Sequence, residues 1–361
     1  MNKILTTKPM DDYLDTTVSR ATFTNQIEAE RLFKILLNVE CQPGLPWTLE
    51  RCEEIAPLTR KINDLKKEKN AIILAHSYVN PEIVYGVADF KSDSYALSLE
   101  ARNADADIII FAGVVFMAET AKILCPDATV IVPDVASGCS LADSLTGKQL
   151  ITLKDKYPGA AVVCYINSSA EIKAESDVCV TSSNVYHIIE KLEQREILFV
   201  PDQLMAINVQ NEMNKRNIDK TIHSSSGTCI VHDQYNAEAI KKARKQYPGI
   251  VVVSHPECNS EVTKISDFVG STGKMMEFVK NSDAPYFMML TECGLVSRLE
   301  VENPNKRFVA SCRLCPYMKL NSLQKIYTSL TNPHPEHIVE IDEKIRLSAL
   351  KSIDRMFELS N

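Results

Sequence analysis

The sequence predicts an α/β protein made of three structurally repeated αβα sandwich domains, with parallel sheets around a pseudo-threefold axis. Three segments, beginning at Ala71, Ala161 and Gly249, each run from an aliphatic stretch through a helical pattern to a second apolar stretch. The tripeptide YPG, at 157–159 and again at 247–249, precedes or opens the second and third segments. Strands that alternate with helices are typical of parallel sheets covered on both faces, and self-similarity at a fixed period indicates a repeat.

The three segments also share polar positions at matching offsets. Each first apolar stretch ends in a ring residue, an aspartate follows twelve or thirteen residues later, and a hydroxyl residue stands five residues beyond it. Successive ring residues are 89 and 90 residues apart. The ring residues are His76, Tyr165 and His255, the aspartates are Asp89, Asp177 and Asp267, and the hydroxyl residues are Ser94, Ser182 and Thr272. We therefore expect three copies of one unit.

Charged helical patterns separate the repeats and set the expected boundaries. The stretches LERCEEIAPLTRKINDLKKEKN, LKDKYPG and AEAIKKARKQYPG precede the three first strands and have the spacing of amphipathic helices. Residues 1–50 are predicted as an N-terminal helical extension, with packing or a dimer contact as its default role. Residues 51–140, 141–230 and 231–315 are predicted as the repeat domains, and 316–361 as a C-terminal helical segment.

Composition narrows the class of protein. The chain has 361 residues, of which 45% are hydrophobic and 24% charged, as is usual for a globular protein with a buried core. A net charge of −7 argues against nucleic acid as the main ligand. No apolar run has the length of a membrane span, and the start MNKILTTKPMDDYLDTT is too polar for a signal peptide. We expect a cytoplasmic protein that binds neither membranes nor nucleic acid.

The predicted fold brings the repeated polar residues together. In open α/β sheets, ligands bind beyond the carboxyl ends of the strands, and the three ring residues stand at those ends. The three hydroxyl residues stand where the next helix should begin, beside free backbone N–H groups that attract anions. Around a pseudo-threefold axis, these groups would line one central cavity.

Eleven cysteines in a chain expected in the cytoplasm indicate metal or redox chemistry at a few of them. Cys125, Cys229 and Cys315 each lie in a loop after the second apolar stretch of a repeat, so we expect three thiolates at the axis. Gly227, two residues before Cys229, suits a close backbone approach to a bulky ligand. Zinc with a fourth ligand and a [4Fe–4S] cluster with one open iron both fit three thiolates.

The other cysteines are predicted to be structural. Cys139 and Cys258 stand in motif-like settings but have no counterpart in all three repeats. Cys312 forms a C-x-x-C pair with Cys315, and a disulfide between them would form only in a metal-free protein because it consumes a ligand. The five predicted to be buried as small hydrophobic side chains are Cys41, Cys52, Cys164, Cys179 and Cys293.

Nine motifs, in order from Ala71 to Leu323, together resemble the quinolinate synthase family. They are ILAHSYVNPEI, ADFKSDSYALS, MAETAKILCPD, PDVASGCSLAD, CYINSSAEIKAESDVCVTSSN, GTCIVHD, SHPEC, GSTGKM and CPYMKLNSL. The resemblance implies a pseudo-threefold α/β fold and a [4Fe–4S] cluster on three cysteines, with one open iron as a Lewis acid. It also implies condensation of iminosuccinate (iminoaspartate) with dihydroxyacetone phosphate to quinolinate, phosphate and water, in de novo NAD biosynthesis.

The resemblance implies roles for residues of the matching motifs. Those implied to hold the cluster are Cys125, Cys229 and Cys315, and those implied to be catalytic are Tyr78, His255 and Glu257. Substrate contacts are implied for His76, Ser94, Tyr165, Ile166, Asn167, Ser182, His255, Pro256, Glu257 and Thr272. We expect Glu257 to act as a base, and His232 to be a hydrogen-bond donor beside the metal rather than a ligand.

Two other functions stay open. Another three-cysteine [4Fe–4S] hydro-lyase would keep the cluster and act on one substrate. A non-catalytic iron or redox sensor would use Cys312 and Cys315 as its switch. For the synthase, the expected partners are its small substrates, with a hand-off of the imine from an aspartate oxidase or dehydrogenase, and the protein is expected to be a monomer or homodimer.

Overall fold

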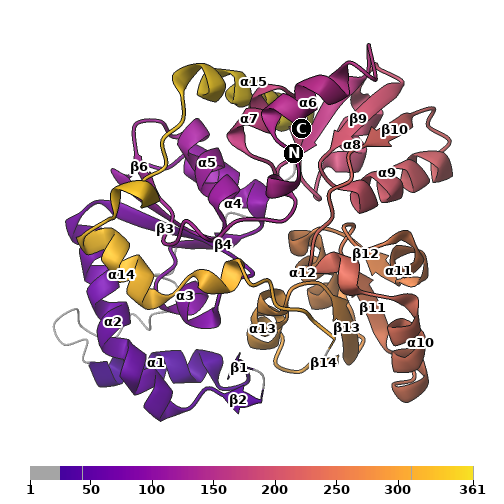
Figure 1. Cartoon of the computed structure of the whole chain (residues 1–361). Helices are drawn as coiled ribbons and strands as arrows, with labels where there is room; N and C mark the ends of the chain where they lie inside the picture. The colour runs from indigo at the N-terminus through magenta and orange to yellow at the C-terminus, as the bar shows by residue number, and fades with distance from the viewer. Residues whose placement is uncertain (1–24, 43, 310, 361) are drawn as a thin grey trace.

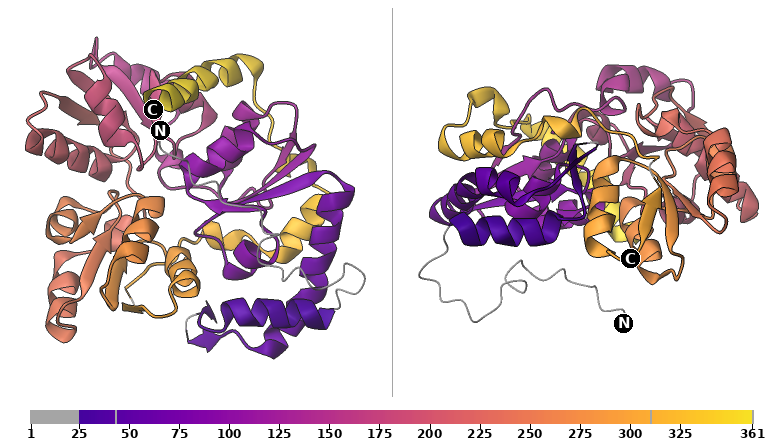
Figure 2. Two further views of the ribbon diagram at one scale, coloured as in Figure 1. Left: turned by 180° about the vertical axis from the view of Figure 1, so that it is seen from behind. Right: turned by 90° about the horizontal axis from the view of Figure 1, so that it is seen from below.

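The computed structural model describes residues 25–42, 44–309 and 311–360, and within them the chain forms three α/β units. Each unit has one four-stranded parallel sheet flanked by helices. Figure 1 shows the units as three lobes around a common centre, and Figure 2 shows the same arrangement from behind and from below. The predicted fold class is confirmed.

The first unit contains the strands β3 to β6, in the spatial order β4-β3-β5-β6. Its strands are β3 (Ala71–His76), β4 (Phe90–Ser92), β5 (Ile108–Ala112) and β6 (Thr129–Ile131). Its helices are α2 (Leu49–Glu68), α3 (Pro81–Gly86), α4 (Ser94–Arg102) and α5 (Val115–Leu124). β3 is an almost unbroken aliphatic run with five of six residues buried, as expected for a strand covered on both faces.

The second and third units repeat this order, as β8-β7-β9-β10 and β12-β11-β13-β14. The second unit has α6 (Gly147–Lys154), β7 (Ala161–Tyr165), α7 (Ala170–Ala174), β8 (Val178–Val180), α8 (Val185–Lys191), β9 (Glu196–Val200), α9 (Gln203–Lys215) and β10 (Thr221–Ser224). The third has α10 (Ala237–Gln246), β11 (Val251–Ser254), α11 (Ser260–Ile265), β12 (Phe268–Val269), α12 (Thr272–Asn281), β13 (Tyr286–Leu290), α13 (Cys293–Glu302) and β14 (Arg307–Val309).

The identical strand order in all three units confirms the predicted triplication. Each unit also has two short strands, its second and fourth, that the sequence pattern did not reveal. The three sheets fall within 51–140, 141–230 and 231–315 respectively.

The repeated aspartates hold the first and second strands of each unit together. The carboxylate oxygens of Asp89, Asp177 and Asp267 accept the backbone N–H of Ile73, Val162 and Val252 at 2.8, 2.7 and 2.8 Å. The backbone N–H of each aspartate returns a hydrogen bond to the carbonyl of that same strand residue. A buried backbone N–H of the first strand is therefore satisfied in the same way three times, which explains why the sequence carries an aspartate at this offset.

The chain ends pack against the units. α1 (Asn25–Leu36) lies against α2 and contributes fully buried Leu32 and Leu36 to the core of the first unit. Residues 1–24 of the predicted N-terminal extension lie outside the described residues. A short hairpin follows α1, formed by β1 (Glu40–Gln42) and β2 (Leu45–Pro46).

The predicted C-terminal helical segment forms two helices that cover two different units. α14 (Leu323–Thr331) packs on α2 and β5 of the first unit, and α15 (Glu343–Ser360) packs on α7 and β8 of the second. Both are visible in the orange-to-yellow part of Figure 1. In the described part of the chain, no helix combines the length and apolar character that a membrane span requires.

Candidate active site

One cavity is lined by side chains from all three units. Its walls lie at the carboxyl ends of the sheets, where the fold predicts a ligand site. Twelve residues predicted from the sequence line it: His76, Tyr78, Ser94, Tyr165, Ile166, Asn167, Ser182, Cys229, His255, Glu257, Thr272 and Cys315. Pro256 and Cys125, also predicted to belong to the site, are not among its described lining residues. Pro256 is buried, and its backbone oxygen accepts a hydrogen bond from the Asn208 side-chain amide at 2.8 Å.

The structure contradicts the prediction that Cys125 shares a site with Cys229 and Cys315. Cys125 is the C-cap of α5, which starts next to the carboxyl end of β5 and runs back along the sheet. Ten helical residues span about 15 Å. Cys125 therefore lies at the opposite edge of the sheet from His76, and the loop that returns to the cavity comes later, after β6.

Cys139, predicted to be structural, takes the equivalent position in the first unit and lines the cavity. Cys139, Cys229 and Cys315 each follow the fourth strand of their unit. Each stands three residues before a 3-10 turn, and these turns are η2 (Ala142–Ser144), η3 (His232–Gln234) and η4 (Met318–Leu320). In each copy the cysteine carbonyl accepts the backbone N–H of the fourth residue onward, at 2.9, 3.0 and 3.2 Å. The three cysteines are thus one repeated position.

A second repeated hydrogen bond fixes these cysteine loops. The carbonyl two residues before each cysteine, in Ser137, Gly227 and Arg313, accepts a backbone N–H from the start of α5, α9 and α13. At Gly227, an added Cβ would lie 2.6 Å from the carbonyl oxygen of Pro201 and closer still to the Ser144 side chain. The glycine expected to approach a ligand therefore approaches neighbouring protein atoms instead.

The thiols of Cys139, Cys229 and Cys315 lie near one another and are weakly acidic. Burial raises the pKa of Cys139 to about 12, and also raises the pKa values of Cys229 and Cys315. Cys315 acts electrostatically on Cys139, and Cys139 on Cys229, which places them near one another. Soft thiolates suit zinc and iron–sulfur clusters, and no fourth described cysteine lines the cavity. The donor set therefore fits a centre with three sulfur ligands and one open position, whose binding would displace the thiol protons.

His76 and His255 are neutral hydrogen-bond donors held in matching orientations. The backbone N–H two residues after each, in Tyr78 and Glu257, donates to its Nδ1 at 3.2 and 3.3 Å. Nε2 must then carry the proton. Burial lowers the pKa of each histidine to about 3, so both rings stay neutral near pH 7.

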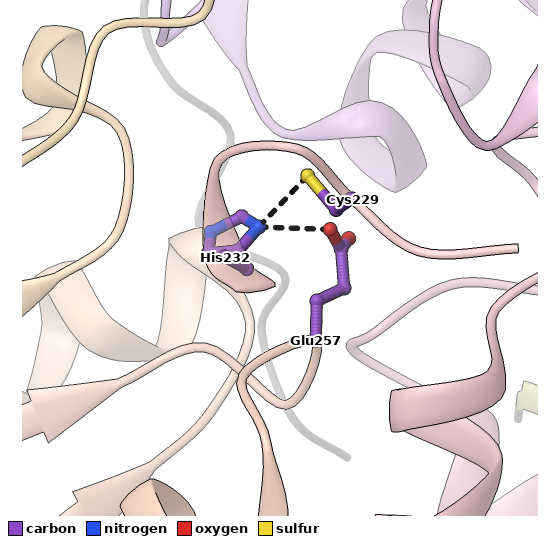
Figure 3. A group of neighbouring side chains, drawn as sticks. All are labelled: Cys229, His232 and Glu257. Atoms are coloured by element: carbon purple, nitrogen blue, oxygen red, sulfur yellow. Dashed lines mark hydrogen bonds and ion pairs between the residues drawn. The ribbon is translucent and has the colours of Figure 1, made fainter. Parts of the chain in front are cut away.

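Glu257 is the centre of a buried polar network. Its Oε1 accepts the Tyr165 hydroxyl at 2.5 Å, and its Oε2 lies 2.8 Å from His232 Nδ1. Figure 3 shows one ring nitrogen of His232 facing both Glu257 and Cys229, and Cys229 Sγ lies 3.3 Å from that nitrogen. Burial raises the pKa of Glu257, but the histidines and the hydrogen bonds from His232 and Tyr165 outweigh it and hold the pKa below its usual range. Glu257 is therefore an ionised carboxylate in a buried site.

Tyr78, in the same network, has a raised pKa and keeps its proton, in contrast to the ionised Glu257. Its hydroxyl lies 3.1 Å from the Thr272 hydroxyl and 2.8 Å from the Thr291 hydroxyl. Burial raises its pKa well above the usual value, so Tyr78 is protonated and can act as an acid. An ionised base and a protonated acid in one cavity are the elements of general acid–base chemistry.

The predicted hydroxyl residues stand at helix starts, as expected. Ser94 and Thr272 are the first residues of α4 and α12, capped by Asp93 and Ser271, and Ser182 lies in the turn before α8. All three line the cavity. The free N–H groups at the starts of α4 and α12 favour an anionic ligand beside them.

The disulfide pattern differs from the sequence prediction. Cys312 is bonded to Cys293, at the start of α13, and not to Cys315. Cys293 is only partly buried, in contrast to the prediction. Cys52, Cys164 and Cys179 are buried free thiols as predicted, and Cys258, predicted to be structural, is also a buried free thiol. The side chain of Cys41 lies outside the described residues.

Comparisons with known proteins identify the family of the chain. The family model described as quinolinate synthetase A protein matches residues 60–358. The chain belongs to the quinolinate synthase family. The quinolinate synthase of Sinorhizobium medicae is 43% identical over 304 residues, or 84% of this chain and 83% of that protein. That of Caulobacter vibrioides is 41% identical over 308 residues, covering 84% and 82%. Quinolinate synthase 2 of Mesorhizobium japonicum is 41% identical over 324 residues, covering 87% and 98%.

The cavity residues of this quinolinate synthase family member that the sequence prediction missed include Cys139, which was predicted to be structural, and Glu292. His232, which was expected to be a donor beside the metal, also lines the cavity. Glu292 is fully buried, accepts the backbone N–H of Cys315 at 3.1 Å, and lies 3.1 Å from the Lys319 amine. A signal for Cys139 was present, because it stands 90 residues before Cys229, the same period as the ring residues. The prolines that follow Cys125 and Cys315 instead favoured Cys125 as the metal ligand of the first repeat.

Proposed function

We propose that this protein condenses iminosuccinate with dihydroxyacetone phosphate to give quinolinate, phosphate and water, as a step of NAD biosynthesis. We further propose that Cys139, Cys229 and Cys315 hold a [4Fe–4S] cluster with one open iron. The observation that carries the proposal is the single cavity at the carboxyl ends of three repeated sheets, lined by one such cysteine from each unit. Family membership supplies the name of the reaction.

The donor set supports a cluster over other centres. Three cysteines without a fourth leave one iron of a [4Fe–4S] cluster open, and when bound it would supply a Lewis acid for a substrate hydroxyl. A single metal ion is the competing centre, since ligand atoms of Cys229, His232 and Glu257 lie within 4.8 Å of one another. That site would use one cysteine, whereas the repeated geometry of three cysteine loops is explained by a ligand on the axis.

The protein residues have three tasks in this proposal. The starts of α4 and α12, with Ser94, Ser182 and Thr272, bind the phosphate and carboxylate groups through hydroxyl and N–H donors. His76 and His255 offer Nε2–H to substrate oxygens without adding positive charge. Burial of the walls excludes bulk water, which protects a hydrolysable imine.

Glu257 and Tyr78 perform the proton transfers. Glu257 is ionised and takes a proton from a substrate carbon as the imine and carbonyl tautomerise. Tyr78 is protonated and gives its Oη proton to a departing hydroxyl, which leaves as water. Tyr165 donates to Glu257 throughout and keeps its carboxylate in place.

The test is an anaerobic assay of the purified protein with both proposed substrates. Quinolinate and phosphate should appear together, with neither formed from one substrate alone. A Glu257→Gln variant should lose on the order of 10²-fold or more of this activity, while retaining the cluster. Dehydration of a single hydroxy acid without quinolinate would indicate a hydro-lyase, and a cluster-loaded protein with no turnover would indicate a sensor.

A further inference from the structure

One lysine side chain is completely buried where the first and second units meet. Lys173 lies on α7 of the second unit and is 0% exposed to solvent. Its ammonium group donates a hydrogen bond to the carbonyl of Ser168. The same nitrogen lies 5.5 Å from the ring centre of Phe116, on α5 of the first unit. Lysine is almost never fully buried unless its charge is paired, so the partners of this charge need to be identified.

Lys173 forms no ion pair with any carboxylate in the described part of the chain. The Lys319 amine, by contrast, lies 3.1 Å from Glu292, and the two charges balance each other. Glu119 on α5 is close enough to Lys173 to interact electrostatically: burial raises the pKa of Glu119, and the charge of Lys173 opposes that rise. The protein therefore balances the positive charge of Lys173 only in part.

The cavity needs a positive charge that its described lining residues do not supply. None of them is a lysine or an arginine, and their carboxyl groups belong to Asp93, Glu257 and Glu292. His76 and His255 stay neutral near pH 7 because burial lowers their pKa values. Substrates with carboxylate and phosphate groups bring further negative charge. A cation behind the wall offsets this charge, because charges interact more strongly in a protein interior than in water.

Phe116 and the segment that follows β7 place Lys173 directly behind the wall. Phe116 lines the cavity, and so does Asn167, the residue before the carbonyl that Lys173 binds. The Lys173 ammonium therefore lies one residue away from the surface that a ligand touches. Its charge can act on a bound anion without a direct contact.

Lys173 also holds this segment in a shape that presents hydrogen-bond donors. The Ser168 hydroxyl donates to the carbonyl of Tyr165 at 2.6 Å, and the Ser168 backbone N–H donates to the carbonyl of Ile166 at 2.8 Å. Lys173 binds the carbonyl of Ser168 itself. The backbone N–H and the side-chain amide of Asn167 have no hydrogen-bond partner among the described residues. These two donors can bind the two oxygens of one carboxylate.

We propose that Lys173 is a positioning residue for anion binding, which fixes the segment that carries Asn167 and adds a positive charge behind it for a substrate carboxylate. The inference rests on the proposed function for the identity of the substrate. It does not depend on turnover, because a small dicarboxylate that does not react should bind to the same place. It assigns Lys173 to ligand affinity, and it gives the burial of this lysine a functional reason.

The test is a calorimetric titration of the full-length protein, purified without oxygen, with succinate, a dicarboxylate with the carbon skeleton of iminosuccinate. Lys173→Met keeps the length of the side chain and removes its charge. It should weaken the affinity for succinate on the order of tenfold, the size expected for one charge acting through a protein wall. The loss should be smaller for succinamate, in which an amide replaces one carboxylate, whereas a merely structural defect would weaken both ligands equally.

Lys122→Met is the matched control, because Lys122 also donates to backbone carbonyls, those of Pro126 and Ala128, but at the far end of α5. It should bind succinate as the wild type does. Glu119→Gln is a second variant, which keeps an acceptor for the backbone N–H of Ala170 and removes a carboxylate that competes for Lys173. It should bind succinate at least as tightly as the wild type, whether or not Lys173→Met folds.

Three results would each overturn the proposal: unchanged succinate binding in Lys173→Met, equal losses for succinate and succinamate in that variant, or weaker succinate binding in Glu119→Gln. A wild-type protein that does not bind succinate would overturn it as well. Succinate binding that depends on Lys173, in a protein that makes no quinolinate, would refute the proposed function and leave this inference standing.

Discussion

Acid should destabilise the fold through His76, by an amount that follows from its burial. Burial, aided by the charge of Arg298, lowers the pKa of this side chain to about 3, compared with about 6.5 for an exposed imidazole. Between pH 6.5 and pH 3 the unfolded chain therefore binds a proton that the folded chain does not. Stability at this residue is complete above pH 6.5 and is lost as the pH falls toward 3.

At pH 5 the expected loss is about 2 kcal/mol, because the pH lies about 1.5 units below the pKa of the exposed ring and each unit corresponds to about 1.36 kcal/mol. The change His76→Asn removes the titrating ring but keeps an acceptor for the Tyr78 N–H. The free energy of unfolding, measured by urea titration of the cluster-free protein, should fall between pH 7.5 and pH 5 by about 2 kcal/mol less in this variant than in the wild type.

An exposed histidine provides the control for this test. His187→Asn removes an imidazole whose side chain is exposed on α8 and should leave the wild-type pH response in place. His255, also buried with a pKa lowered to about 3, contributes equally to the wild type and to the His76 variant, so it cancels in the comparison. Equal pH responses of the wild type and His76→Asn would refute the account of a buried neutral ring.

Two further predictions concern the start of α13, where Cys293 and Gly294 lie. Gly294→Ala should lower kcat and change the near-ultraviolet circular dichroism of the tyrosines. The added Cβ would lie 2.6 Å from the Tyr78 carbonyl oxygen, so the backbone at Tyr78 must move. A variant with unchanged kcat and spectrum would show that this contact does not fix Tyr78. Mass spectrometry of peptides from protein kept oxidised should link Cys293 to Cys312, and a Cys312–Cys315 linkage would contradict the structure.

Much of the fold could be predicted because the repeat left the same polar residues at the same offsets. His76, Tyr165 and His255 end their strands, and parallel strands bring such ends to one edge, so most of the cavity wall followed from position alone. The aspartates were visible for the same reason, although their structural task, holding two strands together, became clear from the hydrogen bonds.

The placement of the cysteines depended on which edge of the sheet each cysteine loop occupies, and the sequence indicates that edge only weakly. β6 has three residues and β10 four, so the fourth strand of each unit did not stand out from the loops around it. Without it, Cys125 was placed at the carboxyl edge and Cys139 was passed over.

The central claim is that one cysteine after the fourth strand of each unit holds the metal centre. The most direct test measures iron and acid-labile sulfide, with the visible absorption spectrum, in Cys139→Ser and Cys125→Ser proteins purified without oxygen. The account predicts that Cys125→Ser keeps the iron and sulfide content of the wild type and that Cys139→Ser loses its cluster. Loss of the cluster in Cys125→Ser with retention in Cys139→Ser would contradict it.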